Sequence, residues 1–225
     1  MTDLRVMNYN VRAGKDDRAA LADVVRGERP DVVIVQEGAR RFRWRSKNAR
    51  LAREWDMVLG AGGLWSLGNL VMTTHRVKVV ETRELQFDLT PGRHMRGMVI
   101  ARCSVGFARF AVAGCHLSLD AAERISQATE LRKQIADLDE PVIIGVDANE
   151  ESGGSAWRIT ADGLTDAAGE DCTLTFSCAK PRKRIDGIFV DPRIEVTGYR
   201  VLDDERVRVA SDHFPMVADL RLPEA

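Results

Sequence analysis

The sequence has few of the features that mark specialised protein classes. Only four of its 225 residues are cysteines and 6% are aromatic, and its apolar runs are no longer than a strand. Lysine and arginine number 33 against 34 acidic residues, so the formal net charge is -1. These scarcities argue against a membrane span, a disulfide framework and a uniformly basic nucleic-acid coat. The N-terminal residues lack the apolar segment of a secretory signal, so we expect a cytoplasmic protein with free thiols.

The chain does contain enough apolar residues for a large core, because 44% of it is hydrophobic. Short β-branched segments predict strands at 4–11, 31–37, 69–74, 76–82, 96–103, 108–117, 141–148, 184–190 and 194–202, with a last strand after residue 213. Amphipathic segments predict helices at 16–28, 120–138 and 155–161. The strands between 69 and 117 leave no room for crossover helices and should form an antiparallel meander. We expect one domain over 1–225, a four-layer α/β sandwich of two packed mixed β-sheets flanked by helices.

Several predicted strands are bordered by carboxylates, amides or imidazoles. These polar residues are Asn10, Glu37, His116, Asp147, Asn149, Asp186, Asp212 and His213. Each has an ordinary explanation when taken alone, since an Asn after a strand is usually a turn former and a Glu there is often a solvated acid. Their repetition at strand ends is what suggests a shared site.

Six segments, taken in chain order, resemble the motifs of the endonuclease/exonuclease/phosphatase superfamily, the DNase I-like fold. The segments are MNYNVR, RPDVVIVQE, GCHLSLD, IGVDANE, RIDGIFV and ASDHFP. Two departures stand out. Gly145 precedes the Asp-x-Asn motif by one residue more than is usual, and Arg12 stands where the abasic-site endonuclease branch carries an acid. Together with His116, Arg12 makes the sequence more similar to the DNase I and sphingomyelinase-like branches.

The resemblance implies a divalent cation, Mg²⁺ or Mn²⁺, and a set of oxygen ligands. By this likeness Asn10, Glu37 and Asp212 would hold the metal. Asp147 would activate or orient the attacking water, and Asn149 would hold the phosphate or position Asp147. Mg²⁺ is usually bound by one or two carboxylates and keeps several of its waters. By neutralising the negative oxygens of a phosphodiester, the cation makes attack by a nucleophile easier.

Two imidazoles complete the implied site. His213 would contact the phosphate, with Asp186 fixing its tautomer and supporting its charge. His116 resembles the residue that stabilises or protonates the departing oxygen. Two histidines at one phosphate would provide acid and base capacity near neutral pH.

The substrate is less well specified by the sequence. Arg12, Asn69, Arg96 and Arg184 are the expected phosphate contacts. The basic and aromatic stretch 38–50 either binds ligand or forms a basic helix face with Leu51, Ala52 and Trp55 turned inward. His75 and His94 match no motif and are expected at the surface.

The leading functional prediction is a metal-dependent phosphodiester hydrolase, most simply a nuclease for DNA or RNA. A second prediction is a phosphatase or phosphodiesterase for a small phosphorylated metabolite or lipid headgroup. A binding module without catalysis is disfavoured, because Glu37, Asp147, Asp186 and His213 are all retained. A serine hydrolase is excluded by the lack of a G-x-S-x-G motif. The partner would be a phosphodiester substrate, with nucleic acid among the candidates and no membrane span, and the oligomeric state stays open.

Overall fold

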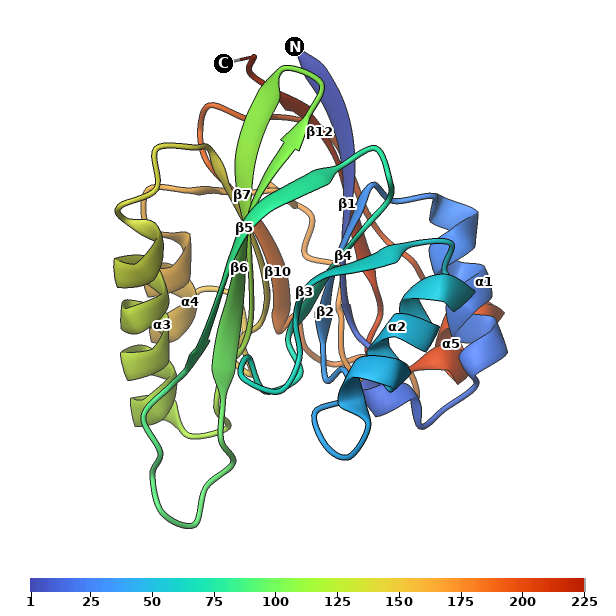
Figure 1. Cartoon of the computed structure of the whole chain (residues 1–225). Coiled ribbons are helices and arrows are strands. Elements are labelled where there is room, and N and C mark those ends of the chain that lie inside the picture. Colours follow the sequence, from blue (N-terminus) through green and yellow to red (C-terminus); the bar gives the residue numbers. More distant parts are fainter. Residues whose placement is uncertain (225) are drawn as a thin grey trace.

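The computed structural model describes residues 1–224, which form two six-stranded β-sheets packed face to face (Figure 1). The strands are β1 (Thr2–Asn10), β2 (Val32–Gln36), β3 (Val58–Gly62), β4 (Leu70–Thr73), β5 (Lys78–Gln86), β6 (Gly97–Val105), β7 (Ala108–His116), β8 (Val142–Asp147), β9 (Thr165–Asp166), β10 (Asp186–Val190), β11 (Glu195–Val201) and β12 (Met216–Leu222). The helices are α1 (Arg18–Glu28), α2 (Trp44–Glu54), α3 (Ala121–Ile135), α4 (Ser155–Ala161) and α5 (Glu205–Ala210), and a 3-10 turn spans Arg12–Gly14. The first sheet has the order β11-β12-β1-β2-β4-β3, and the second has the order β5-β6-β7-β8-β10-β9.

Helices cover the outer face of each sheet, so the fold has four layers. In Figure 1, α1, α2 and α5 lie against the first sheet, and α3 and α4 lie against the second. The sequence of β2 explains this layering, because Val32 and Ile34 pack between the sheets while Val33 and Val35 pack under the helices. A strand buried on both faces needs an apolar residue at nearly every position. The predicted four-layer α/β sandwich is confirmed.

One parallel strand pair lies within each sheet and fixes the position of the site. β1 pairs parallel with β2, and β7 pairs parallel with β8. Their neighbours β12, β4, β6 and β10 run antiparallel. The carboxyl ends of the parallel strands therefore lie beside the amino ends of β10 and β12. In Figure 1 this edge lies away from the two chain termini.

The predicted antiparallel meander between residues 69 and 117 is wrong in part. β4 pairs with β2 and β3 in the first sheet, whereas β5, β6 and β7 form a meander in the second sheet. The segment 74–77 turns the chain from one sheet to the other. The burial of the two strands agrees with this, since β4 is buried along its whole length and β5 is a largely exposed edge strand.

The predicted helices form with small changes at their ends. α1 begins after Asp17 because the Asp17 carboxylate accepts hydrogen bonds from the backbone N–H groups of Ala19 and Ala20. The predicted helix 155–161 is α4, and the basic stretch forms α2 with Leu51 and Ala52 buried and Trp55 buried just after it. The sequence does not predict β3, β9 or α5, which are short elements without a strong periodic pattern.

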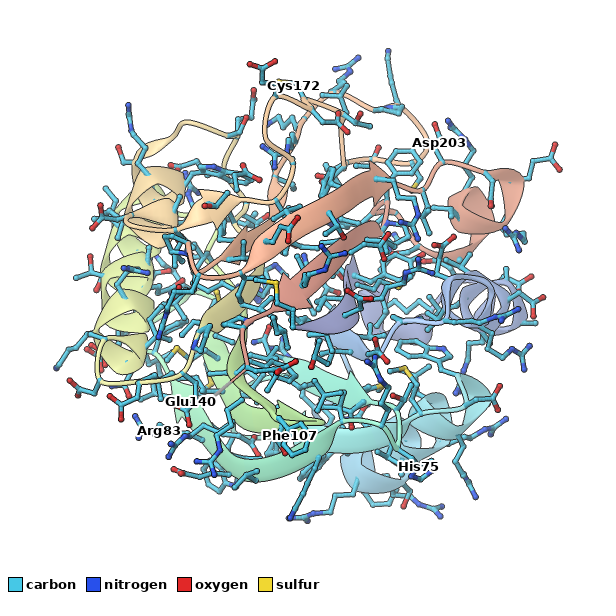
Figure 2. All side chains as sticks on the ribbon, turned by 90° about the horizontal axis from the view of Figure 1, so that it is seen from above. His75, Arg83, Phe107, Glu140, Cys172 and Asp203 are labelled. Carbon is cyan, nitrogen blue, oxygen red and sulfur yellow. The ribbon has the colours of Figure 1, made fainter. Side chains whose placement is uncertain are left out.

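The two chain termini lie at the end of the molecule opposite the site (Figure 1). Figure 2 looks onto this end and shows His75 at the periphery, as the sequence predicts. Within residues 1–224, no helix has the length and apolar character that a membrane crossing requires.

Candidate active site

A cavity of about 720 Å³ opens at the edge where the parallel strands end. Seven residues predicted from the sequence line it, namely Glu37, Arg96, His116, Asp147, Asn149, Asp212 and His213. Asn10 and Asp186 lie directly beneath these residues, hydrogen-bonded to Asp147 and His213 respectively. The fold therefore gathers side chains from both sheets into one place.

The two sheets meet closely beneath the cavity. Asn8 accepts a hydrogen bond from Gln36 in its own sheet at 2.8 Å and donates one to the backbone carbonyl of Val146 in the other sheet at 3.2 Å. A Cβ atom on Gly145 would lie 2.5 Å from the Asn8 side-chain oxygen and 2.7 Å from Ile34. Glycine is therefore required at position 145, because a methyl group there would push the sheets apart.

Asn10 joins the residues of the first sheet to those of the second. Its Nδ2 atom donates to Asp147 Oδ2 at 2.8 Å and lies 3.5 Å from both Glu37 Oε1 and His213 Nε2. Its Oδ1 atom accepts from the backbone N–H of Arg12 at 3.0 Å and keeps a second lone pair. Because the amide is buried, its hydrogen bonds hold the Asp147 carboxylate and the Arg12 backbone in place, with Glu37 and His213 beside them.

Glu37 follows β2 in a strained but well-supported conformation. Its φ angle is 57°, in the left-handed region that costs free energy for a residue with a Cβ. The next residues are anchored, since the Gly38 N–H donates to the Gly68 carbonyl and the Asn48 side chain bonds both backbone groups of Ala39 at 2.9 Å. This anchoring aims a partly exposed carboxylate into the cavity.

His213 and Asp186 form a buried pair. His213 Nδ1 lies 3.0 Å from Asp186 Oδ2, and the Phe176 ring packs on the imidazole at a centroid distance of 4.7 Å. Burial alone would lower the pKa of His213, but the charge and hydrogen bond of Asp186 raise it to about 10. Burial raises the pKa of Asp186, and the charge of His213 counters that effect. His213 therefore carries a proton at neutral pH.

His116 has a different environment from His213. Its Nδ1 atom lies 3.2 Å from Arg96 Nη1, and its Nε2 atom lies 3.3 Å from Asp147 Oδ2 and 2.9 Å from Asn149 Nδ2. Burial lowers the pKa of His116 to about 3, and the nearby positive charge of Arg96 adds to this effect. Arg96 only donates and the Asp147 carboxylate only accepts, so these two contacts favour a neutral imidazole with its proton on Nε2. The Asn149 amide nitrogen is also a donor and does not hydrogen-bond to a protonated Nε2, but it donates to the backbone carbonyl of Leu117 at 2.9 Å.

Asp147 stands between the two imidazoles. Burial would raise its pKa, yet the imidazoles of His116 and His213 and the hydrogen bond from Asn10 hold the pKa below the usual value. The backbone N–H of Asn149 also donates to Asp147 Oδ1 at 3.1 Å. The carboxylate is therefore ionised at neutral pH and rigidly oriented.

Two groups of residues offer donors for a divalent cation. Asp147, Asp186 and His213 place ligand atoms within 4.8 Å of one another. This group suits a cation poorly, because His213 is protonated and bonded to Asp186. Glu37 fits better, since within residues 1–224 its carboxylate has no ion-pair partner and accepts one long hydrogen bond, from Asn10 Nδ2 at 3.5 Å. Asp212, which is partly exposed on the same cavity, is the other available carboxylate.

The remaining predicted contacts divide into two kinds. Arg96 lines the cavity, and Arg12 lies at its rim with Nε 3.3 Å from Asp212 Oδ2. Asn69 uses both amide hydrogens on the carbonyls of its own loop and of β6, at 2.7 and 2.8 Å. Arg184 is buried in an ion pair with Asp166 at 2.7 Å. The geometry of Asn69 and Arg184 supports a structural role for both.

Some residues of the cavity were not predicted from the sequence. Lys15, His94 and Phe176 also line it, and Lys47 comes from the stretch 38–50, for which ligand binding was one of two open interpretations. Lys15 directly follows the 3-10 turn that begins at Arg12, so its closeness to the motif MNYNVR could have indicated its place in the cavity. Phe176 reaches the cavity from a long loop that bridges to His213 through the backbone, and no local pattern indicates this.

Comparisons with known proteins bear on the family and the fold. Residues 7–213 match the family model described as the Endonuclease/Exonuclease/phosphatase family. No curated protein sequence matches the chain significantly. One similar solved structure is an endonuclease/exonuclease/phosphatase from Bacteroides vulgatus, with a TM-score of 0.81 and 18% identity over 99% of this chain and 100% of that chain. Another is the mannosyl-6-phosphatase Bt3783 from Bacteroides thetaiotaomicron, with a TM-score of 0.79 and 17% identity over 97% of this chain and 100% of that chain. A third is D. rerio TDP2 complexed with single-strand DNA product, with a TM-score of 0.77 and 19% identity over 98% of this chain and 100% of that chain. At these identities the structural likeness shows the fold alone.

Proposed function

Because this chain belongs to the endonuclease/exonuclease/phosphatase family, whose members hydrolyse phosphoric esters, we propose that it is a divalent-metal-dependent phosphodiester hydrolase acting on nucleic acid. The observation that carries the proposal is the cavity itself. It combines a free carboxylate at Glu37, an ionised Asp147 and a protonated His213 within one cavity. A metal ligand, a base for the attacking water and a charged donor to the phosphate can each speed the hydrolysis of an anionic ester.

Mg²⁺ or Mn²⁺ is the proposed cofactor, as expected for a metal-dependent family. Glu37, Asn10 and Asp212 would hold it through oxygen atoms, which both ions accept. When bound, the cation would neutralise phosphate charge and polarise the bond to the leaving oxygen. The ion pair of Asp212 with Arg12 holds that carboxylate at the rim of the cavity.

Asp147 is proposed to orient the attacking water and accept its proton. Its carboxylate is ionised at neutral pH, and the contacts of Asn10 and Asn149 fix its direction. His213 would donate its Nε2 hydrogen to a phosphate oxygen, since Asp186 occupies Nδ1. A positively charged donor in a buried position stabilises the extra negative charge of the transition state.

His116 is proposed to act as a neutral hydrogen-bond donor. Its low pKa argues against proton delivery from an imidazolium at neutral pH. The Nε2–H group points toward Asp147, where the reacting phosphate would sit, and the Arg96 contact holds the ring in that tautomer. This refines the role implied by the sequence, where stabilising and protonating the leaving oxygen were both open.

The rim of the cavity favours a nucleic-acid strand. Lys15, Arg40, Arg41 and Lys47 line it, and Phe42 beside them is 82% exposed. Cations that follow a phosphate backbone and an aromatic ring that can stack on a base are typical of single-strand binding. The similar solved structures include both kinds of protein, since one is a TDP2 complexed with single-strand DNA product and another is a mannosyl-6-phosphatase. They therefore do not decide between a nucleic-acid and a small-molecule substrate.

A substrate comparison tests the proposal. The protein would be incubated with Mg²⁺ or Mn²⁺ and one of four substrates: bis-p-nitrophenyl phosphate, p-nitrophenyl phosphate, supercoiled plasmid or a single-stranded oligonucleotide. We expect diester and nucleic-acid cleavage that Asp147→Ala and His213→Ala each reduce by roughly 10²–10⁴-fold. His75→Ala, which removes an exposed histidine, is the matched control and should retain wild-type rates.

Other outcomes would redirect the proposal. Hydrolysis of the monoester alone would favour the second candidate, a phosphatase for a small phosphorylated metabolite or lipid headgroup. An inert wild type that still binds metal would favour a binding module. We also propose a cytoplasmic location, because all four cysteines are free and three of them are buried.

A further inference from the structure

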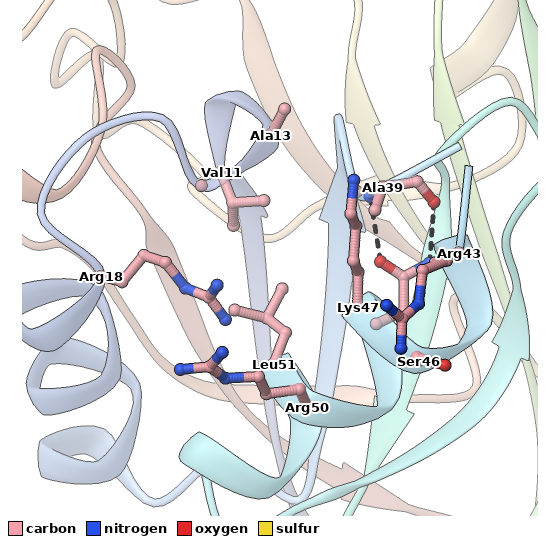
Figure 3. Close-up of a pocket in the computed structure, with 12 residues that line it drawn as sticks. Val11, Ala13, Arg18, Ala39, Arg43, Ser46, Lys47, Arg50 and Leu51 are labelled. Atoms are coloured by element: carbon pink, nitrogen blue, oxygen red, sulfur yellow. Dashed lines mark hydrogen bonds between the residues drawn. The ribbon is translucent and has the colours of Figure 1, made fainter. Parts of the chain in front are cut away.

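A second cavity of about 480 Å³ lies beside the active site, between the 3-10 turn and α2 (Figure 3). We call it the basic pocket, and its lining residues are Val11, Ala13, Gly14, Arg18, Gly38, Ala39, Arg43, Ser46, Lys47, Asn48, Arg50 and Leu51. Ala13, Gly38, Ala39 and Lys47 line the active-site cavity as well. The two cavities are therefore neighbours that share a wall.

The lining of the basic pocket carries an excess of positive charge. Its charged lining residues are the four cations Arg18, Arg43, Lys47 and Arg50. Glu54, just behind, pairs with Arg18 at 2.8 Å and with Arg50 at 2.9 Å. Within residues 1–224, Arg43 and Lys47 have no ion-pair partner. Two of the four lining cations are thus paired with one acid and two are unpaired, and such an excess of positive charge in a concave site favours an anionic ligand.

The cations surround the pocket instead of gathering on one side. Figure 3 shows Arg18 and Arg50 toward one side and Arg43 and Lys47 toward the other, with Leu51 between them. The start of α2 adds hydrogen-bond donors, because no side chain caps its first turn and Ser46 there lines the pocket. A tetrahedral anion could therefore be contacted from several directions.

We propose that the basic pocket binds a second phosphate group of the substrate while the ester to be hydrolysed occupies the active-site cavity. The inference rests on the proposed function and specifies its substrate class. Lys47 lines both cavities and lies between the two phosphates. The second phosphate belongs either to the next nucleotide of a strand or to the far end of a small bisphosphate.

Paired substrates test this proposal. The dinucleotide d(TpT) would be compared with d(pTpT) and with d(TpTp), because the direction in which a strand would cross the site is not fixed. Fructose 6-phosphate would be compared with fructose 1,6-bisphosphate. We expect the second phosphate to raise kcat/KM by about tenfold or more at low ionic strength, since charged hydrogen bonds are strong and salt-sensitive. The gain should come mostly through KM, because the pocket does not touch the reacting phosphate.

Two variants distinguish the effect of the pocket cations from that of positive charge elsewhere on α2. In Arg43→Gln/Arg50→Gln the advantage should fall to about threefold or less, since two of the four cations are gone. Arg53→Gln removes an exposed cation of α2 outside the pocket and should keep the full advantage. Thermal melting would establish that both variants fold. The proposal is overturned if the wild type shows no advantage, if the double variant keeps it, or if Arg53→Gln loses it equally.

The two substrate pairs also identify the source of the phosphate. An advantage for the dinucleotides alone supports a strand, and one for the sugars alone supports a small bisphosphate. Calorimetric binding of d(TpT) and d(pTpT) or d(TpTp) in EDTA separates this inference from the hydrolase proposal. Tighter binding of a phosphorylated form in EDTA, with no hydrolysis once Mg²⁺ or Mn²⁺ is added, keeps the pocket and refutes the hydrolase. Hydrolysis with no effect of the second phosphate on rate or binding keeps the hydrolase and refutes the pocket.

Discussion

Replacing Asp186 with asparagine should convert His213 from a charged to a neutral imidazole at neutral pH. The pair is buried, with His213 Nδ1 3.0 Å from Asp186 Oδ2. Its interactions raise the His213 pKa from 6.5 to about 10, which corresponds to about 5 kcal/mol in favour of the charged form. Asparagine keeps the shape and can still accept from Nδ1–H, but it removes the charge. Burial, which lowers the pKa, would then dominate because Asp147 is farther away at 3.8 Å.

The dependence of kcat/KM on pH reads out this change. With bis-p-nitrophenyl phosphate and saturating Mg²⁺, the wild type should keep a protonated His213 up to a pH of about 10. In Asp186→Asn the alkaline fall should begin below 6.5, so the rate at about pH 8 should drop by roughly 10²–10⁴-fold and partly recover on acidification. An alkaline limb that stays at the wild-type position would refute the assignment. Asp191→Asn, at the other end of β10, is the control and should leave the profile unchanged.

Stability should follow the same titration with a defined sign. Folded His213 binds its proton more tightly than the unfolded chain does, so its contribution is complete below pH 6.5 and is lost as the pH rises to about 10. The free energy of unfolding of the wild type should therefore fall over this range with a slope approaching about 1.36 kcal/mol per pH unit. Urea unfolding of Asp186→Asn should lack this fall. A variant with the wild-type slope would show that other groups cause it.

Two further predictions concern the supports of the site. Asn48→Ala removes both side-chain hydrogen bonds that anchor the loop after Glu37, so calorimetry should show weaker Mn²⁺ binding by about tenfold, and unchanged binding would contradict the anchoring role. Gly145→Ala should lower the free energy of unfolding by about 1–3 kcal/mol, because its Cβ would lie 2.5 Å from the side-chain oxygen of Asn8. The helical Gly27→Ala, whose nearest neighbour is a flexible side chain at 3.7 Å, should be neutral or stabilising in the same urea titration.

The parts of the fold that the sequence predicts are those with local causes. Val32 to Val35 are apolar at every position and therefore indicate a strand covered on both faces. Glu37 and His116 were found because each follows an apolar strand, and parallel strands bring their ends to one edge. The amphipathic pattern of 16–28 predicts a helix, and the structure shows that Asp17 starts it through its own hydrogen bonds.

The parts that escaped prediction depend on residues far apart in the chain. β4 belongs to the first sheet because it pairs with β2, more than thirty residues earlier in the chain. The short turn between β4 and β5 gives no local indication that the chain passes there to the second sheet. The basic charges of α2 are visible in the sequence, but the pocket appears only once the 3-10 turn packs beside them. Phe176 reaches His213 from a separate loop for the same reason.

The Mg²⁺ dependence of phosphodiester hydrolysis tests the central claim most directly. Protein freed of metal with EDTA would be titrated with Mg²⁺ while the initial rate on bis-p-nitrophenyl phosphate is followed, with wild type beside Glu37→Gln. The account predicts no rate without metal, a saturable rise in the wild type, and a half-saturating Mg²⁺ concentration at least about tenfold higher in Glu37→Gln. A rate that is independent of metal, or the same Mg²⁺ dependence in both proteins, would contradict it.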